Sequence, residues 1–283
     1  MSERMKEEAE YGEYPASQNS PRSTATKTED ICNYDMKTLL PKEEIRATSV
    51  SDESVYASIL RAARILFEPS QVVELRAIFK NGRVDSGYFD DFSLMAESAA
   101  KLNKRAGVSG IYWTLNPVNP DCLHRAKNHV REWASKSKGG AATSDSDILE
   151  RRFILLDFDG TNRPAGISAT CDELKAAKRK TYDTAKFLAS RKWGNPIAAM
   201  SGNGYHLLYR TVLPNDRQSA DLLKRCLASL SVMFDDEKTK IDTSVFNASR
   251  ICKIYGTMAR KGDDTPERPH RISALFRTAG EKL

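Results

Sequence analysis

The order of apolar and polar positions along the chain predicts an ordered part that follows a polar N-terminal arm. Residues 1–50 are rich in Ser, Thr, Glu and Lys, and neither a helical nor a strand period persists in them. We therefore expect this arm to be disordered or flexible. The ordered part begins near Asp52, a residue that can cap a helix, because apolar residues then recur every three or four positions through Leu66.

In residues 51–140 the pattern predicts an N-terminal α/β unit. Residues 72–79 alternate between apolar and polar side chains as a strand does. Asn81-Gly82 directly after them is a strong hairpin signal, with the return strand over 84–88. The other elements expected in this half are a helix over 92–104, a strand over 110–115, a helix over about 121–135 and a break at Gly139-Gly140.

Residues 141–283 are predicted to form the half that carries the motifs. A near-continuous apolar run predicts a central strand over 153–158, and Thr170-Cys-Asp-Glu173 matches a capping box that begins a helix reaching about Lys192. The remaining elements are strands over 197–200, 205–209 and 251–255 and a helix over 216–234. Strands and helices do not alternate regularly, and one hairpin accompanies the 153–158 strand. We therefore predict an α+β fold with antiparallel pairing.

Composition narrows the setting of the protein without assigning a function. The chain has 283 residues, of which 40% are hydrophobic and 29% charged, and its formal net charge is +6. These values are ordinary for a soluble globular protein and compatible with nucleic-acid binding. The five cysteines are scattered without a C-x-x-C pair, so neither a disulfide framework nor a zinc site is expected. No apolar run is long enough to cross a membrane and the N-terminus lacks a secretory signal, so we expect a cytoplasmic protein without a membrane partner.

Three aspartates stand where a metal ion could be held. Asp157 and Asp159 come at the end of the 153–158 strand, and they point to the same side because side chains along a strand repeat with a period of two. Asp242 follows a single Ile later in the chain. Carboxylate oxygens are the ligands of hard cations such as Mg²⁺ and Mn²⁺. A D-x-D at a strand end can equally be a turn or capping feature, so the pair alone does not identify a metal site.

A glycine-rich turn, Ser201-Gly-Asn-Gly-Tyr-His206, joins two of the predicted strands. Gly202 and Gly204 permit positive φ and close approach of a ligand to the backbone, and successive N–H groups in such a turn can bind an anion. Ser201 and His206 each offer a hydrogen bond to a phosphate oxygen. The alternative is a plain hairpin turn with a histidine that is satisfied internally.

The last motif is a basic stretch with no acidic residue between Asp242 and Asp263. Its cations alternate with apolar residues such as Ile251, which indicates a semi-buried element rather than a solvated face. Arginine suits bidentate phosphate contacts and lysine supplies a point charge. The residues expected to meet a triphosphate are Arg250, Lys253, Thr257, Arg260 and Lys261, the last two with template phosphates as the other option.

Together these segments resemble the motif set of the archaeo-eukaryotic primase superfamily, and in particular the primase-polymerases of phages, plasmids and mobile elements. That family carries an acidic pair on a strand, a serine-glycine-histidine turn, and an aspartate followed by N-x-x-R-x-x-K-x-Y-G-T. Here these are Asp157 with Asp159, residues 201–206, and residues 242–257. The resemblance covers about residues 55–275. Further segments that are similar to such proteins are 74–76, 86–90, 112–117 and 143–148.

The resemblance implies a fold and a chemistry. The fold would be a primase-polymerase catalytic core over residues 51–283, in which a mixed sheet like that of the RNA-recognition motif is joined to the N-terminal α/β unit. The three aspartates would be catalytic and would hold two Mg²⁺ or Mn²⁺ ions. The nucleotide-binding residues would be the basic set above together with Ser201, Gly202, Asn203, Gly204 and His206. The implied activity is template-directed nucleotidyl transfer from NTPs or dNTPs, in replication or repair of DNA.

The resemblance also implies partners, namely a single-stranded DNA template and a primer strand. Relatives often carry a superfamily 3 helicase behind this domain, whereas this sequence ends at Leu283 and contains no G-x-x-x-x-G-K-[ST] loop. The chain is therefore expected to be either a stand-alone enzyme or one for which a helicase is supplied separately. Exposed aromatic side chains such as Tyr88 or Trp113 would offer stacking platforms to the template. Ordinary core packing is the alternative for both, and it is the favoured one for Trp113, which lies within an apolar strand.

Two other readings stay open. Residues 155–161 also fit the D-x-D-G-T signature of haloacid-dehalogenase-type phosphatases, with Asp157 as nucleophile and Asp159 as general acid. In that class the strand before Ser201 should lead into a helix rather than a hairpin, and Asp242 would have no task. The other reading is a catalytically inactive nucleic-acid-binding module, against which the intact acidic residues argue.

Overall fold

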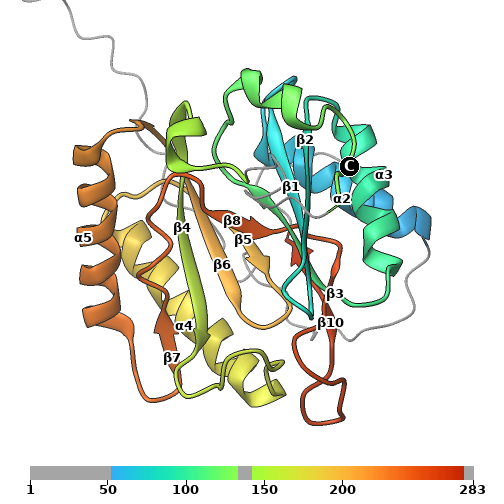
Figure 1. Cartoon of the computed structure of the whole chain (residues 1–283). Coiled ribbons are helices and arrows are strands. Elements are labelled where there is room, and N and C mark those ends of the chain that lie inside the picture. Colours follow the sequence, from blue (N-terminus) through green and yellow to red (C-terminus); the bar gives the residue numbers. More distant parts are fainter. Residues whose placement is uncertain (1–51, 133–141, 277–283) are drawn as a thin grey trace, which may run out of the picture. The chain divides into compact units, whose positions relative to one another are not determined.

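Two antiparallel sheets lie side by side in the part of the chain that the structure describes (Figure 1). The computed structural model describes residues 52–132 and 142–276, all of them within one unit that spans Asp35–Leu283. One sheet has four strands in the order β2-β1-β3-β8, and the other has five in the order β11-β5-β6-β4-β7. A further antiparallel pair joins β9 and β10.

The two sheets draw on both halves of the chain. The four-stranded sheet consists of β1 (Val73–Phe79), β2 (Val84–Phe89), β3 (Val108–Thr114) and β8 (Ile251–Lys253). The five-stranded sheet consists of β4 (Glu150–Gly160), β5 (Ile197–Met200), β6 (Tyr205–Pro214), β7 (Thr239–Ile241) and β11 (Ala274–Leu275). The short pair is β9 (Met258–Ala259) with β10 (Arg271–Ile272). Since β8 comes from the C-terminal half and pairs with β3, it joins that half of the chain to the four-stranded sheet.

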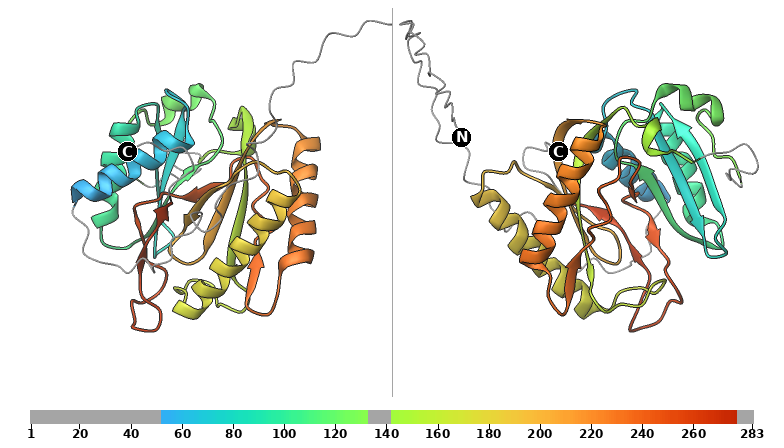
Figure 2. Two further views of the ribbon diagram at one scale, coloured as in Figure 1. Left: turned by 180° about the vertical axis from the view of Figure 1, so that it is seen from behind. Right: turned by 60° about the vertical axis from the view of Figure 1, so that its left-hand side comes forward.

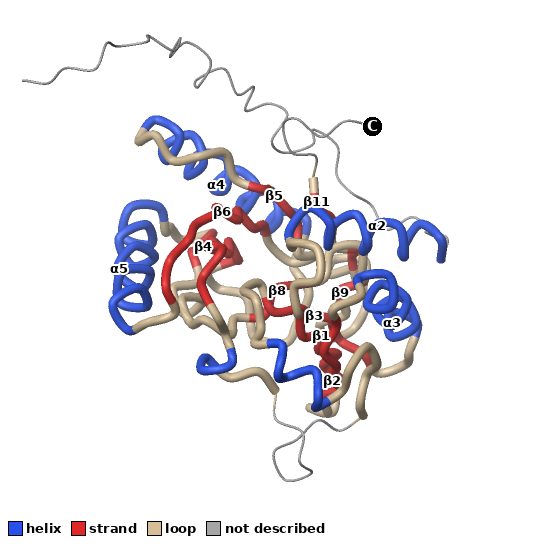
Figure 3. Tube along the Cα trace, turned by 90° about the horizontal axis from the view of Figure 1, so that it is seen from above, coloured by secondary structure: helices blue, strands red, loops and turns tan. Residues whose placement is uncertain are grey.

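Helices cover the outer side of each sheet, as Figures 2 and 3 show. They are α2 (Asp52–Leu66), α3 (Phe92–Lys104), α4 (Cys171–Ser190) and α5 (Arg217–Phe234). The first two pack against each other, and α3 contacts β1, β2 and β3. In the second half α4 packs on β4, β6 and β7, and α5 lies beside β7. Among the described residues, no helix combines the length and apolar character that a membrane crossing requires.

Local signals account for most of these elements, and the α+β fold with antiparallel pairing is confirmed. Thr170 and Glu173 form the expected capping box at the start of α4. Asp216 caps α5 by accepting a hydrogen bond from Ser219 N–H at 2.7 Å. The predicted arm over residues 1–50 and the break at Gly139-Gly140 lie outside the described residues.

The helix predicted over about 121–135 is wrong for the part that the structure describes. Pro120–Arg125 forms only a 3₁₀ turn, η1, and the backbone that follows bonds to the edge of β2 instead of to itself. The N–H of Tyr88 donates to Ala126 O at 3.0 Å, and Ser86 and Arg131 exchange two backbone hydrogen bonds. This segment covers a sheet edge that would otherwise expose unpaired backbone groups.

The aromatic residues considered as stacking platforms are both buried. Trp113 is fully buried and packs edge-on against Phe67 and Tyr255, as expected for a core residue. Tyr88 is only 2% exposed, so the prediction that it is an exposed platform is wrong. Its hydroxyl accepts a hydrogen bond from Arg125 at 3.2 Å, so the ring belongs to an internal polar network.

The predicted hairpin at residues 201–204 is confirmed as the turn between β5 and β6. Gly204 lies against the neighbouring strand: a Cβ atom there would overlap the carbonyl oxygen of Phe158 and Oδ1 of Asp159. Gly202 has a φ of +98°. Glycine at these two positions therefore allows the turn to pass close to β4.

Replacing Gly204 by alanine is expected to destabilise the protein by about 3 kcal/mol, because the new methyl group meets backbone that cannot move aside. Urea unfolding followed by circular dichroism measures this difference. Gly194→Ala is the matched control, since a Cβ there meets nothing within 4 Å. We expect it to change stability by less than about 0.5 kcal/mol. Equal midpoints for the two variants would contradict the close packing of the turn on β4.

Candidate active site

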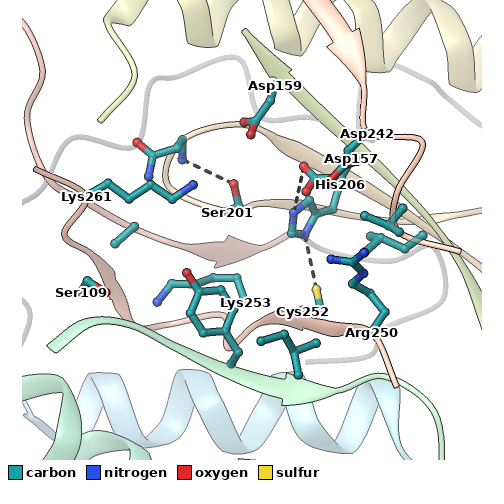
Figure 4. A pocket seen from close by; sticks show the side chains of 16 residues that line it. Ser109, Asp157, Asp159, Ser201, His206, Asp242, Arg250, Cys252, Lys253 and Lys261 are labelled. Carbon is teal, nitrogen blue, oxygen red and sulfur yellow. Dashed lines mark hydrogen bonds and ion pairs between the residues drawn. The ribbon is translucent and has the colours of Figure 1, made fainter. Parts of the chain in front are cut away.

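A cavity of about 100 Å³ opens where the two sheets meet (Figure 4). It is lined by side chains from β3, β4, β6, β8 and the segments around them. The sequence-predicted residues among them are Asp157, Asp159, Ser201, Asn203, His206, Asp242, Arg250, Lys253 and Lys261. This volume has room for several water-sized groups, so the enclosed part suits ions and their ligands. A larger substrate would extend outward from it.

The acidic pair occupies one face of β4, as the period of two predicts. Asp157 stands directly opposite His206 of β6 in the antiparallel register, and its Oδ1 lies 3.3 Å from His206 Nε2. Asp159 stands opposite Lys240 of β7, and its Oδ1 lies 2.8 Å from Nη2 of Arg163. Asp157 is therefore paired with a histidine of the neighbouring strand, and Asp159 with an arginine four residues later in the sequence.

The two carboxyl groups differ in pKa direction. Burial alone would raise the pKa of Asp157, but the charge and hydrogen bond of His206 outweigh it and hold that pKa below its ordinary value. Burial, followed by the negative charge of Asp157, raises the pKa of Asp159. Like charges this close together disfavour joint ionisation. A divalent cation between the two groups would remove this conflict.

His206 is buried and held from both sides. Its Nδ1 lies 2.8 Å from the hydroxyl of Tyr255 and 3.5 Å from the sulfur of Cys252, while Nε2 meets Asp157. Burial would lower the pKa of His206, but Cys252 and then Asp157 raise it well above its ordinary value. The imidazole is thus fixed in orientation by Tyr255 and presents its other nitrogen to the acidic pair.

Asp242 approaches the acidic pair from the end of β7. Its backbone N–H donates to Asp157 O at 2.9 Å, and its Oδ1 accepts a hydrogen bond from Ser244 N–H at 2.8 Å. Within residues 52–132 and 142–276, no three His, Cys, Asp or Glu side chains are already gathered around one point, as the side chains are placed. Figure 4 nevertheless shows the three aspartates on the same side of the cavity.

The chemistry of these donors fits a hard divalent cation. The ion pair between Arg163 and Asp159 is not aligned as a hydrogen bond, and no other described residue donates one to the buried Oδ1 of Asp159. A buried carboxylate oxygen without a hydrogen bond is costly unless something else satisfies it. Mg²⁺ or Mn²⁺ would do so with oxygen ligands alone.

Lys253 is the most buried cation of the site, at 3% exposure. Its Nζ donates to Thr257 Oγ1 at 2.7 Å and to Met258 O at 3.0 Å, and it lies 5.6 Å from the centre of the Tyr112 ring. Burial, together with the charges of Arg260 and Lys261, lowers the pKa of Lys253 well below its ordinary value.

Arg250 lies at the opposite end of the cavity wall and is held by its own loop. Its Nε donates to Asn247 Oδ1 at 2.9 Å, and its Nη2 donates to the backbone oxygen of Ser244. Lys261 lines the cavity beyond the glycine turn, and its charge acts on both Asp157 and Asp159. In Figure 4 Lys261 lies to the left of the cavity, Lys253 below it and Arg250 to the right, beneath His206.

The glycine turn uses its N–H groups internally. Ser201 Oγ accepts hydrogen bonds from Gly204 N–H at 3.0 Å and from Asn203 N–H at 3.4 Å. The side chain of Asn203 accepts from Ala169 N–H at 2.8 Å. Of the turn residues, Ser201 and Asn203 line the cavity, and Gly202 and Gly204 do not.

Two basic-stretch residues support the site from outside the cavity. Thr257 is fully buried, bonds to Lys253 and donates to Ile254 O at 2.6 Å. Arg260 donates from Nη2 to Asn103 O at 2.8 Å, on α3. Its Nη1 is buried, and no described residue accepts a hydrogen bond from it.

Several lining residues were not among the sequence candidates, notably Tyr112 and Cys252. Burial, and then the charge of Asp157, raises the pKa of Tyr112 to about 12. Arg163, which lies beside Asp159, was likewise not predicted as a site residue. Its position four residues after Asp159 was a possible signal, but Pro164 and Gly166 next to it indicate only a loop.

Comparison with known proteins adds little to this geometry. No protein-family model matches this sequence, and no curated protein matches it either. Among solved structures, the chain is similar to the crystal structure of primase RepB' with a TM-score of 0.45 and 10% identity. The alignment covers 80% of this chain and 57% of that one, so this chain spans little more than half of that protein's length. At this TM-score the similarity supports no statement about activity.

The buried Lys253 gives a testable pH dependence. Because its pKa is lowered in the folded protein, the unfolded chain binds more protons between that value and the ordinary lysine pKa of about 10.4. Stability relative to Lys253→Met should therefore rise with pH in this window, by at most about 1.4 kcal/mol per pH unit. Urea unfolding of both proteins between neutral and alkaline pH measures it. A difference that stays constant with pH would mean that Lys253 titrates alike in both states.

Proposed function

We propose that the chain is a nucleotidyltransferase that adds NTPs or dNTPs to a DNA primer along a template, as a primase or polymerase. The observation that carries this proposal is one cavity that three aspartates and three basic side chains line together. These are Asp157, Asp159, Asp242, Arg250, Lys253 and Lys261. A nucleoside triphosphate bound with divalent ions needs both sets, since the ions take carboxylate ligands and the phosphate oxygens take cationic donors.

The aspartates would hold Mg²⁺ or Mn²⁺. When bound, two such ions supply charge neutralisation at the triphosphate and a lowered pKa for the attacking 3′-hydroxyl. The residues of the chain itself orient and position. Arg250 and Lys261 offer donors at the two ends of the cavity, where phosphate oxygens can be gripped from both sides. His206 acts through Asp157, whose carboxylate it fixes.

The phosphatase alternative has little support in the fold. The strand before Ser201 runs through a glycine turn into an antiparallel partner, β6, rather than into a helix. The strand that carries Asp157 is antiparallel to both of its neighbours, β6 and β7. Asp242, which that mechanism leaves without a task, lies in the same cavity.

The proposed partners follow from the proposed reaction. Single-stranded DNA would serve as template with a primer strand, and the formal net charge of +6 suits phosphate contacts. Binding should be sequence-tolerant, because the cations of the site offer phosphate contacts.

Extension of a labelled primer on a single-stranded template, with NTPs or dNTPs and Mg²⁺ or Mn²⁺, tests the proposal directly. We expect template-dependent products that require the metal. Release of phosphate from generic phosphoesters without extended product would favour the phosphatase. DNA binding without either reaction would favour the inactive binding module.

Replacing any of the three aspartates by asparagine should lower the turnover number by more than about 100-fold. Removing a residue that only supports a metal ligand already lowers metal affinity or activity about 10- to 100-fold, and here a ligand itself is changed. Steady-state primer extension measures it, with unfolding midpoints to verify that each variant is folded. Asp242→Asn is the most discriminating variant, since the competing phosphatase assigns it no role. Near-normal extension by that variant would remove the two-ion arrangement.

Tyr255→Phe tests whether the fixed orientation of His206 matters. Removing the hydroxyl deletes the 2.8 Å contact to Nδ1 and frees the imidazole that faces Asp157. We expect the metal concentration for half-maximal activity to rise by up to about tenfold, the lower end of what loss of a group that supports a metal ligand costs, because Tyr255 acts on Asp157 through His206. The KM for nucleotide should change little, because the Tyr255 hydroxyl bonds to His206 and Cys252 and the substitution leaves Arg250, Lys253 and Lys261 unaltered. A raised nucleotide KM at unchanged metal requirement would place His206 on the triphosphate instead.

A further inference from the structure

The segment that joins β7 to β8, residues 242–250, carries two residues of the site and contains neither helix nor strand. Asp242 stands at its start and Arg250 at its end, 8 positions apart in the sequence. We name this segment the junction loop. Its shape decides where one carboxylate and one guanidinium stand, so whatever holds the loop positions both.

Two buried side chains hold the middle of the junction loop by its carbonyl groups. Arg151, on the face of β4 that carries Asp157, donates from Nη1 to Phe246 O at 2.6 Å. Asn116, just after β3, donates to Ala248 O at 2.8 Å. The cavity beside Arg151 measures only about 10 Å³, which is room for a single water and not for a phosphate. Arg151 therefore acts as a clamp on the loop and not as a second anion site.

The third contact comes from a side chain at the surface. Oδ1 of Asp145 accepts two hydrogen bonds from Ser249, one from the backbone N–H at 2.8 Å and one from the hydroxyl at 2.7 Å. Ser249 immediately precedes Arg250. This contact joins residues 104 positions apart in sequence, so no local turn preference explains it.

The segment that carries Asp145 is itself anchored to the N-terminal sheet. Glu74, fully buried on β1, accepts a hydrogen bond from Thr143 N–H at 3.1 Å, and Arg76 donates to Thr143 O at 2.9 Å. Arg125 forms an ion pair with Asp147 at 2.9 Å. Asp145 lies between these two anchors, in the 3₁₀ turn η3 (Asp145–Asp147). Segments 74–76 and 143–148 thus have a structural role, and neither takes part in the proposed chemistry.

We propose that Asp145 is a positioning residue, which clasps Ser249 and thereby fixes the end of the junction loop that presents Arg250 to the substrate phosphates. This inference rests on the proposed function for its kinetic consequence, whereas the clasp itself is a property of the folded chain. Through it the four-stranded sheet controls the distance between Arg250 and the aspartates of the five-stranded sheet.

The carboxylate suits this task because an ionised aspartate only accepts hydrogen bonds, and both Ser249 groups donate. Burial would raise the pKa of Asp145, but the hydrogen bonds from Ser249 and Asn247 outweigh it and lower that pKa. The contact is therefore intact throughout the neutral range. Asparagine keeps an acceptor oxygen at the same place, and alanine keeps none.

Hydrogen–deuterium exchange of the full chain tests the clasp without reference to activity. In Asp145→Ala the amides of residues 246–250 should exchange about tenfold faster, because the Ser249 N–H loses its acceptor and its loop loses an anchor. Asp145→Asn should exchange nearly as slowly as the unaltered protein. Ser146→Ala is the matched control, since Ser146 is exposed in the same turn and its hydroxyl meets Ser144. Unchanged exchange over 246–250 in a folded Asp145→Ala protein overturns the proposal.

Primer-extension kinetics then test the positioning role. We expect Asp145→Ala to raise the KM for nucleotide by about tenfold with a smaller change in kcat, and Asp145→Asn to restore most of it. A loss of kcat alone, not rescued by asparagine, would reassign Asp145 to a general role in stability. If the unaltered protein extends no primer, the proposed function fails, and the exchange measurement still decides the clasp.

A second variant covers the case in which Asp145→Ala does not fold. Ser249→Ala removes the hydroxyl bond from the loop side and leaves the N–H bond in place. It should raise the nucleotide KM by about threefold, and should add nothing further in the presence of Asp145→Ala, if that protein folds. Additive effects of the two substitutions, or no effect of Ser249→Ala, would show that the two residues act independently.

Discussion

Two carboxylates placed two positions apart on a half-buried strand are the constraint on which this site depends. Side by side in a cavity, Asp157 and Asp159 repel each other and lose hydration. In the structure the two carboxylates have different surroundings. The antiparallel register brings His206 opposite Asp157, while Arg163 reaches Asp159 in an ion pair that leaves Oδ1 without a hydrogen bond. The buried Oδ1 of Asp159 is the oxygen that a divalent cation would satisfy.

The same constraint explains the glycine turn in terms of packing. To bring His206 opposite Asp157, the β5–β6 hairpin must pass directly against β4, and only a residue without a side chain fits at Gly204. The hydroxyl oxygen of Ser201 then accepts hydrogen bonds from the N–H groups of Gly204 and Asn203 in this tight turn. The anion-binding interpretation of this turn therefore competes with a structural one, and the polar atoms that it offers to the cavity are side chains of Ser201 and Asn203.

Elements with local causes could be predicted from the sequence, and elements with distant causes could not. Caps and periodicity located α4 and α5 because a helix satisfies its own backbone. The helix prediction was wrong for the segment after η1 because the backbone groups of this segment bond to β2, and no local sequence pattern reveals that pairing. In the site the same rule holds. The period of two placed the acidic pair correctly on one face, whereas the contact of Tyr255 with His206 joins residues 49 positions apart.

The position of the cavity between two sheets has a consequence for how it is built. Asp242 is attached to the five-stranded sheet through Asp157, and Arg250 continues into β8, which belongs to the four-stranded sheet. A site divided in this way is only as well defined as the contacts that cross between its two sides. Arg151, Asn116 and Asp145 make such contacts, and Glu74 and Arg76 stiffen the segment behind one of them. Glu74 and Asn116, buried polar residues of the N-terminal half, thus belong to a framework that helps to set the geometry of a site they do not line.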